Sequence, residues 1–122
     1  MKAAADVLPC HVVLPPEWDD FFNRRGPLPP RESEPRRFVR QHFPTRAIME
    51  LTTTLAAIPR KYAKYVVLMK DISRQGASFL HVAQLFPGER VELTLATGRI
   101  PYTVMRCRRH NDACYEIGAE IA

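Results

Sequence analysis

Apolar and polar residues alternate along most of the chain after residue 46, which is the pattern of half-buried strands. The alternating or short apolar segments are residues 46–52, 65–69, 77–80, 91–95, 100–104 and 115–121. Turn-forming residues separate most of these segments, and no long helical pattern lies between them. About six short strands joined by turns predict an all-β fold, either an antiparallel barrel or a sandwich.

A short helix is predicted near the N-terminus, over residues 16–25. Pro16 suits the first helical turn, where a backbone N–H has no partner within the helix. Gly26 suits the left-handed position that ends many helices. Apolar side chains that include Trp18 and Phe21 share one face of this helix. That face either packs on the rest of the domain or docks another protein.

Composition favours a globular, cytoplasmic protein with an anionic partner. The chain has 122 residues, 46% of them apolar, and neither an apolar run long enough to span a membrane nor the apolar core of a secretion signal. A formal net charge of +5 favours nucleotides, nucleic acid or an acidic protein surface. Cys10, Cys107 and Cys114 have no metal-ligand spacing, so we expect free thiols, with a Cys107–Cys114 disulfide as the alternative.

Patterns typical of catalytic sites are missing from the chain. The histidines have no metal-ligand spacing, and the sequence contains no nucleophile elbow and no phosphate-cradling glycine loop. Asp71 and Ser73 lie two residues apart, but no histidine is close in sequence to complete a relay. We therefore expect a binding protein, not an enzyme, with no metal or cofactor.

The segment Asp71-Ile72-Ser73-Arg74-Gln75-Gly76 has the chemistry of a binding site. A carboxylate can accept two adjacent N–H groups, such as those on the Watson–Crick edge of guanine, and a hydroxyl both donates and accepts. Glycine permits a positive φ or the close approach of a flat ring. An ordinary turn is the alternative, in which Asp71 and Ser73 bond to their own backbone.

A cluster of arginines, Arg36, Arg37 and Arg40, follows a connector rich in proline. Arginine is planar and always charged, and it can fork onto phosphate or onto O6 and N7 of guanine. The connector is expected to be extended or turned, because proline fixes its own φ and disfavours helix in the preceding residue. A solvated basic run is the alternative interpretation.

Taken together, the two segments resemble the motifs of the PilZ domain family. The chain has Arg-x-x-x-Arg at residues 36–40 and Asp-x-Ser-x-x-Gly at residues 71–76, with strand-like sequence between them. Apolar residues precede Asp71, and Ile117-Gly118 falls in a closing strand, as in the family. The resemblance covers roughly residues 31–122, which form the predicted barrel domain, and leaves residues 1–30 as an N-terminal extension with the short helix.

The resemblance implies a six-stranded antiparallel barrel that binds cyclic di-GMP, a bacterial second messenger. Arginines would grip phosphates and guanine edges, an acid and a hydroxyl would contact guanine, and a glycine would let a ring approach. In this chain the ligand-binding residues are then expected to be Arg36, Arg37 and Arg40, together with Asp71, Ser73 and Gly76.

The predicted function is a single-domain receptor that signals to a protein partner, with no DNA or RNA bound and no insertion into a membrane. Ligand binding is expected to order the lead-in segment, residues 27–40, against the barrel. One alternative is a PilZ-like adaptor that binds proteins without nucleotide. Another is a small barrel that binds single-stranded nucleic acid, although the aromatic residues are not clustered with basic neighbours on one strand.

Overall fold

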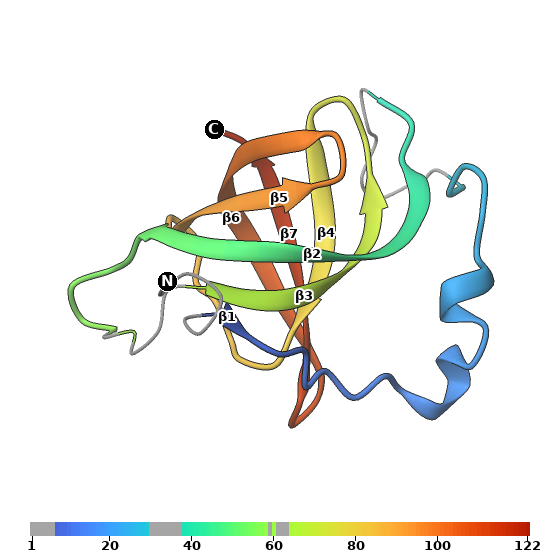
Figure 1. Cartoon of the computed structure of the whole chain (residues 1–122), viewed down its shortest axis with the longest axis horizontal. Coiled ribbons are helices and arrows are strands. Elements are labelled where there is room, and N and C mark those ends of the chain that lie inside the picture. The colour runs from blue at the N-terminus through green and yellow to red at the C-terminus, as the bar shows by residue number, and fades with distance from the viewer. Residues whose placement is uncertain (1–6, 30–37, 59, 61–63) are drawn as a thin grey trace.

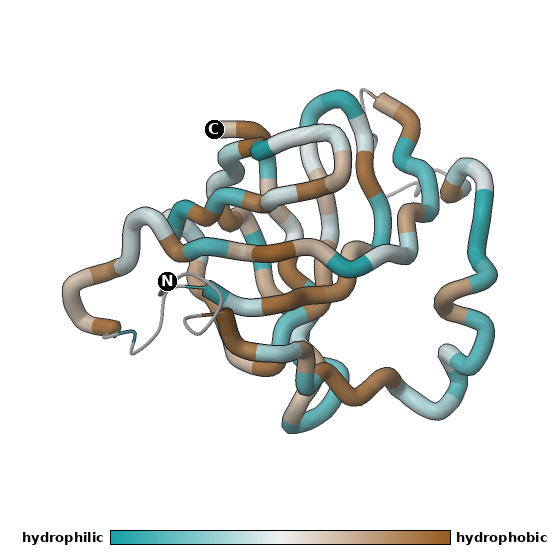
Figure 2. The backbone as a smooth tube through the Cα atoms, in the orientation of Figure 1, coloured by the Kyte–Doolittle hydropathy of each residue, from teal (hydrophilic) through white to brown (hydrophobic). Residues whose placement is uncertain are grey.

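The computed structural model describes residues 7–29, 38–58, 60 and 64–122. Its main strands, drawn in Figure 1, are β2 (Gln41–Thr53), β3 (Lys64–Ile72), β4 (Gly76–His81), β5 (Arg90–Leu95), β6 (Gly98–Asn111) and β7 (Cys114–Ile121). A strand of two residues, β1 (Val7–Leu8), precedes them. Hydrophobic residues, brown in Figure 2, form a continuous run in β3 and alternate with polar residues along β5.

The six main strands close into an antiparallel barrel. Their order is β3-β2-β5-β6-β7-β4, and pairing between β4 and β3 closes the sheet on itself. The short strand β1 pairs with the start of β3 in parallel. The prediction of an all-β, six-stranded antiparallel barrel is confirmed, and the sandwich alternative is wrong because the sheet closes.

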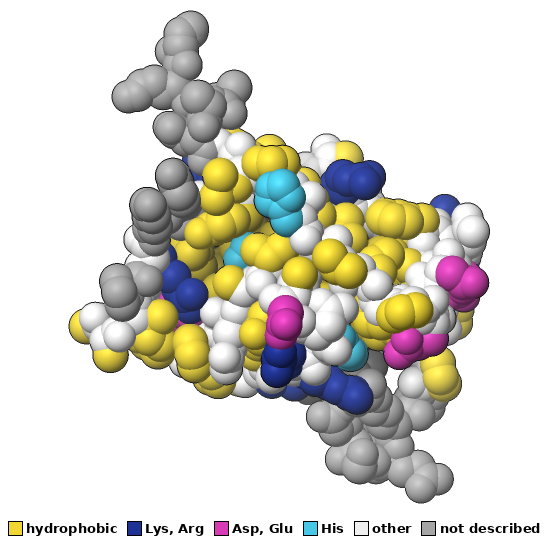
Figure 3. Space-filling model, turned by 90° about the horizontal axis from the view of Figure 1, so that it is seen from below, with side chains coloured by type: hydrophobic (Ala, Val, Ile, Leu, Met, Phe, Trp, Pro, Cys, Tyr) yellow, Lys and Arg dark blue, Asp and Glu magenta, His cyan; other side chains and the backbone are white. Residues whose placement is uncertain are grey.

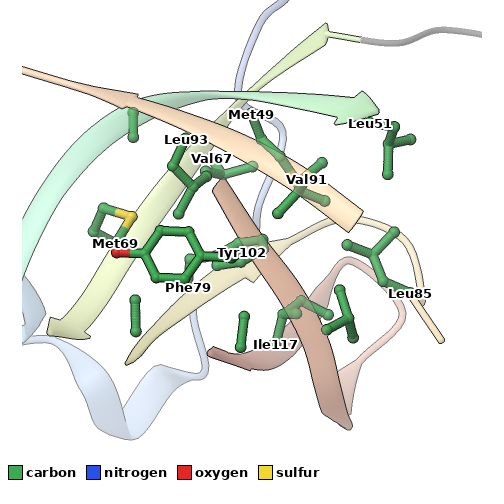
Figure 4. Close-up of a cluster of buried hydrophobic side chains, with 14 of the residues drawn as sticks. Met49, Leu51, Val67, Met69, Phe79, Leu85, Val91, Leu93, Tyr102 and Ile117 are labelled. Atoms are coloured by element: carbon green, nitrogen blue, oxygen red, sulfur yellow. The ribbon is translucent and has the colours of Figure 1, made fainter. Parts of the chain in front are cut away.

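Inward-facing side chains fill the interior of this barrel (Figure 4). Met49, Val67, Met69, Phe79 and Leu93 are all fully buried there, at 0% exposure. Burying each such side chain contributes about 1.5–3 kcal/mol relative to leaving it exposed. Because the interior is packed with side chains, a ligand of nucleotide size has to bind on the outside of the barrel.

A β-bulge in β3 decides which side chains of this strand face outward. Leu68 and Met69 pair with Leu80 and Phe79, but the next pairing joins Asp71 to Ser78, so Lys70 is an extra residue in the strand. Strict alternation would place Asp71 on the same side as the core residue Met69. The extra residue shifts the alternation, and Asp71 lies outside the barrel beside Ser78.

The predicted N-terminal helix is present as two consecutive 3-10 turns, η2 (Pro16–Trp18) and η3 (Phe21–Asn23). Neither turn has a side-chain cap, and so short a segment has little helical stability of its own. Gly26 has the expected positive φ, 85°. Phe21 is 1% exposed and packs outside the barrel with Leu68 and Leu80, so the apolar face packs on the domain.

The register of β6 and β7 gives no support to a disulfide between Cys107 and Cys114. Cys107 pairs with Ile117, whereas Cys114 pairs with Asn111 across the end of the hairpin. All three cysteines are free thiols. Burial raises the pKa of the Cys114 thiol to about 11, with the nearby Glu116 carboxylate adding to the effect, so this thiol stays protonated and unreactive.

We expect acid to destabilise the barrel through His81. This side chain is 2% exposed at the end of β4, and burial, helped by the Arg60 cation, lowers its pKa from 6.5 to about 4. Between these two pH values, the unfolded chain therefore binds more protons than the folded chain. The contribution of His81 to the free energy of unfolding is fully present above the pKa that His81 has in the unfolded chain. It decreases as the pH falls toward the pKa that His81 has in the folded chain, by at most about 3 kcal/mol.

Urea unfolding at about pH 7 and about pH 4.5 measures this dependence, with His81→Gln as the comparison because glutamine does not titrate. The substituted protein should lose less stability in acid than the unchanged protein. Equal losses in the two proteins would show that His81 does not carry the effect.

Candidate functional site

Arg40 precedes β2 and lies against the outside of the barrel, where it contacts β3 and β4. Its Nη1 atom donates to Oδ1 of Asp71 at 3.2 Å and to Oγ of Ser78 at 3.0 Å. The Arg40 side chain is 11% exposed and that of Asp71 only 1%. The structure therefore brings one residue from each predicted motif together, although Arg40 and Asp71 lie 31 residues apart in the chain.

The second oxygen of Asp71 is held by Lys70, its neighbour in the bulge. Lys70 Nζ lies 3.2 Å from Asp71 Oδ2 and 3.6 Å from Oε2 of Glu116 on β7. The other oxygen of Glu116, Oε1, lies 2.8 Å from Nε2 of His110. These contacts form one network that runs from Arg40 through Asp71, Lys70 and Glu116 to His110.

Glu116 remains ionised within this network. Burial by itself would raise the pKa of Glu116, but Lys70 and His110 outweigh it and hold the pKa below its usual value. Each charge in the network consequently has a partner of opposite charge, which is what partly buried charges require. The network fixes the head of Arg40, because Asp71 cannot turn without losing either Arg40 or Lys70.

Ser73 forms the turn between β3 and β4. Its Oγ accepts hydrogen bonds from the backbone N–H of Gly76 at 3.1 Å and of Gln75 at 3.3 Å, and its own N–H donates to the Gly76 carbonyl at 2.8 Å. For Ser73 this matches the ordinary-turn alternative. The turn is shorter than predicted, because β3 continues to Ile72 and Asp71 belongs to the strand.

Gly76 is required by the close approach of two strands. A Cβ atom on Gly76 would lie 2.5 Å from the carbonyl oxygen of Ala119 on β7, too near for any side chain. The described glycines with positive φ are Gly26, Gly88 and Gly98, so Gly76 does not adopt the positive φ that a glycine permits. The missing Cβ lets β7 pair closely with the start of β4.

Arg36 and Arg37 lie outside the described residues, but the structure describes the residues on either side of their segment. Leu28 N–H donates to the Arg40 carbonyl at 2.8 Å, and His42 N–H donates to the Gly26 carbonyl at 2.9 Å. Residues 26–28 are thus paired with residues 40–42, and the predicted ordering by ligand cannot apply to the whole of residues 27–40.

Several residues of the network were not predicted from the sequence. Ser78 is a lone hydroxyl residue in an apolar run, and that isolation was its only signal. Lys70, His110 and Glu116 had no signal, because their contacts depend on the bulge and on the pairing of distant strands.

Trp18 connects the N-terminal extension to the same network. Its ring packs edge-on against His110, with 4.7 Å between centroids, and Lys70 Nζ lies 6.0 Å from the ring centre. The extension crosses the underside of the barrel (Figure 1), and that underside is largely apolar at its surface (Figure 3). Val13 and Phe22 of the extension are 57% and 41% exposed.

Within the described ranges, no group of histidine, cysteine and acidic side chains is arranged to hold a metal ion. No helix in that part of the chain is long and apolar enough to cross a membrane.

The chain was also compared with known proteins. The model of the PilZ domain family matches residues 34–121, a range that contains both predicted motifs. A search of curated proteins found no match to the chain.

Proposed function

Because the chain belongs to the PilZ domain family, as its sequence predicted, we propose that it is a receptor for cyclic di-GMP that signals to a protein partner. In this proposal it works in the cytoplasm by binding and carries out no catalysis. The observation that carries the proposal is the contact of Arg40 with Asp71 and Ser78, which joins the two motifs on the outer face of the barrel.

The chemistry of the ligand suits these residues. Cyclic di-GMP has two phosphates and two guanines, and a guanidinium can fork onto a phosphate or onto the O6 and N7 atoms of guanine. We propose that Arg36, Arg37 and Arg40 supply these contacts. A guanidinium whose direction is already set by a buried carboxylate loses little entropy when it binds, and this favours Arg40 as the central contact.

Asp71, Ser73 and Gly76 are proposed to face a guanine at the turn that they border. A guanine that bonded to the Asp71 carboxylate would have to compete with Arg40 and Lys70 for its oxygens. Such competition would alter the network as far as Glu116. In this way, ligand binding could be transmitted to Trp18 and to the surface of the N-terminal extension, while the segment around Arg36 becomes ordered.

We expect the protein to bind cyclic di-GMP in isothermal titration, and Arg40→Ala to weaken binding by about 1–3 kcal/mol. Arg99→Ala is the matched control, because Arg99 is 74% exposed on a different hairpin and should not affect affinity. The emission of Trp18, the only tryptophan in the chain, should change during the titration. Absence of binding by the unchanged protein would refute the function, and unchanged affinity in Arg40→Ala would remove Arg40 from the site.

An adaptor that binds proteins without nucleotide is the second candidate. The exposed apolar side chains of Val13 and Phe22 on the N-terminal extension favour it, because such a surface suits a protein contact. This candidate predicts no heat on titration with cyclic di-GMP. If the ligand were a nucleic acid, its affinity for the protein would fall steeply as salt is added.

A further inference from the structure

A row of outward-facing residues runs around the barrel from the candidate site to β6. Asp71 on β3 pairs with Ser78 on β4, Ser78 pairs with Gly118 on β7, and Gly118 pairs with Arg106 on β6. Neighbouring strands lie about 4.8 Å apart, so Gly118 is one strand spacing from the hydroxyl that holds Arg40. Arg106 follows one spacing further.

The side chain of Arg106 lies across β7, over Gly118. Its Cζ atom is 2.7 Å, and its Nε and Cγ atoms are each 2.9 Å, from the point that a Cβ on Gly118 would occupy. Any side chain at residue 118 would collide with it, so the glycine provides the space in which Arg106 lies. The guanidinium therefore sits over the residue next to Ser78.

The guanidinium presents a flat face to the solvent. The atoms nearest to the Gly118 Cβ point are Cζ and Nε of the group, not the terminal nitrogens, so Gly118 faces the plane of the group and not its edge. The opposite face then points away from the barrel. Arg106 is exposed, and within the described residues it has no hydrogen bond or ion pair, whereas the nearby Glu116 is held by Lys70 and His110.

We propose that Arg106 is a further ligand-contacting residue, whose guanidinium stacks on the face of one guanine of cyclic di-GMP. Arginine stacks on aromatic rings through both its charge and its planar shape. In this arrangement one half of the ligand is held at Arg40, and the other half extends over Ser78 and Gly118 to lie on Arg106. The inference rests on the proposed function, because it assigns a second contact within the same site.

Titration of the full chain with cyclic di-GMP tests this contact. Arg106→Ala should weaken binding about tenfold, as expected when a cation–ring contact of moderate strength is lost. Arg108→Ala is the control, since Arg108 is exposed on the same strand but pairs with Glu116, outside the row. Arg106→Lys keeps the charge and loses the plane, so stacking predicts that it binds as weakly as Arg106→Ala.

Each result of this titration decides between alternatives. If Arg106→Ala binds as well as the unchanged protein, the inference is overturned while the proposed function stands. If Arg106→Lys retains full affinity and Arg106→Ala does not, the contact is electrostatic and the stacking assignment is wrong. If the unchanged protein does not bind cyclic di-GMP, the proposed function is refuted, and the assignment of Arg106, which depends on it, is refuted as well.

Discussion

Replacing Asp71 with alanine is expected to destabilise the barrel by about 3–5 kcal/mol, the usual cost of removing one partner from a buried ion pair. The carboxylate is 1% exposed and has Arg40 on one oxygen and Lys70 on the other, with side chains 11% and 13% exposed. Its removal would leave two largely buried cations facing the same space. Urea unfolding near neutral pH measures the change.

The control for Asp71→Ala is Asp20→Ala. Asp20 also forms an ion pair, with Arg24 at 3.0 Å, but its side chain is 61% exposed, so solvent screens the pair and its loss should cost far less stability than the loss of Asp71. Asp71→Asn keeps the shape and one acceptor oxygen and should fall between the two. If Asp71→Ala cost no more than Asp20→Ala, then Asp71 would not be the residue that fixes Arg40 and Lys70.

Asp71→Asn should also weaken the binding of cyclic di-GMP. The substitution removes the charge that directs Arg40, and under the proposed function it also removes a contact to guanine. Titration of Asp71→Asn is more informative than titration of Asp71→Ala, because the milder variant remains folded more securely.

Glu89→Ala is expected to destabilise the protein by a similar amount, about 3–5 kcal/mol, without changing the affinity for ligand. Glu89 is 0% exposed and binds Arg60 through both oxygens, with Arg60 Nε donating to Oε2 at 3.1 Å. Its Oε1 also accepts the backbone N–H of Phe86 at 2.8 Å. The substitution would leave Arg60 and this N–H without their acceptor.

The comparison between the two carboxylates separates stability from binding. Glu89 lies just before β5, which pairs with the end of β2 at Thr53, whereas Arg40 lies just before the start of β2. Glu89→Gln should recover part of the stability, because the amide oxygen can still accept from Phe86. A loss of affinity in Glu89→Ala under conditions where the protein remains folded would contradict this separation.

The alternation of side chains was sufficient to predict most of the strands. In a strand with one face in a core, apolar side chains recur at every second residue. Segments such as Val91–Leu95 and Tyr115–Ile121 show this period. The inward-facing residues of these segments are the ones that fill the barrel. The order and spacing of the two polar motifs were enough to predict the family, because they depend on residue types alone.

The contacts at the site were decided only by the tertiary structure, whereas the closed barrel was already implied by the family resemblance. The bulge at Lys70 turns Asp71 outward, whereas an unbroken strand would place it on the same side as Met69, and the bulge depends on how β3 pairs with β4. Ser78 and Glu116 join the network because β4 and β7 lie beside β3, and no local pattern encodes such neighbours. For the same reason, the sequence assigned Gly76 to a turn, whereas the approach of Ala119 explains it.

The N-terminal extension shows the same division between local and long-range information. Its sequence predicted a short turn of helix with an apolar face, because these depend on proline, glycine and residue spacing. The sequence left open what the face contacts and whether the helix is α or 3-10, because packing on the barrel decides both. The chain alone thus determined which residues could serve a site, and strand pairing between distant segments determined which of them meet.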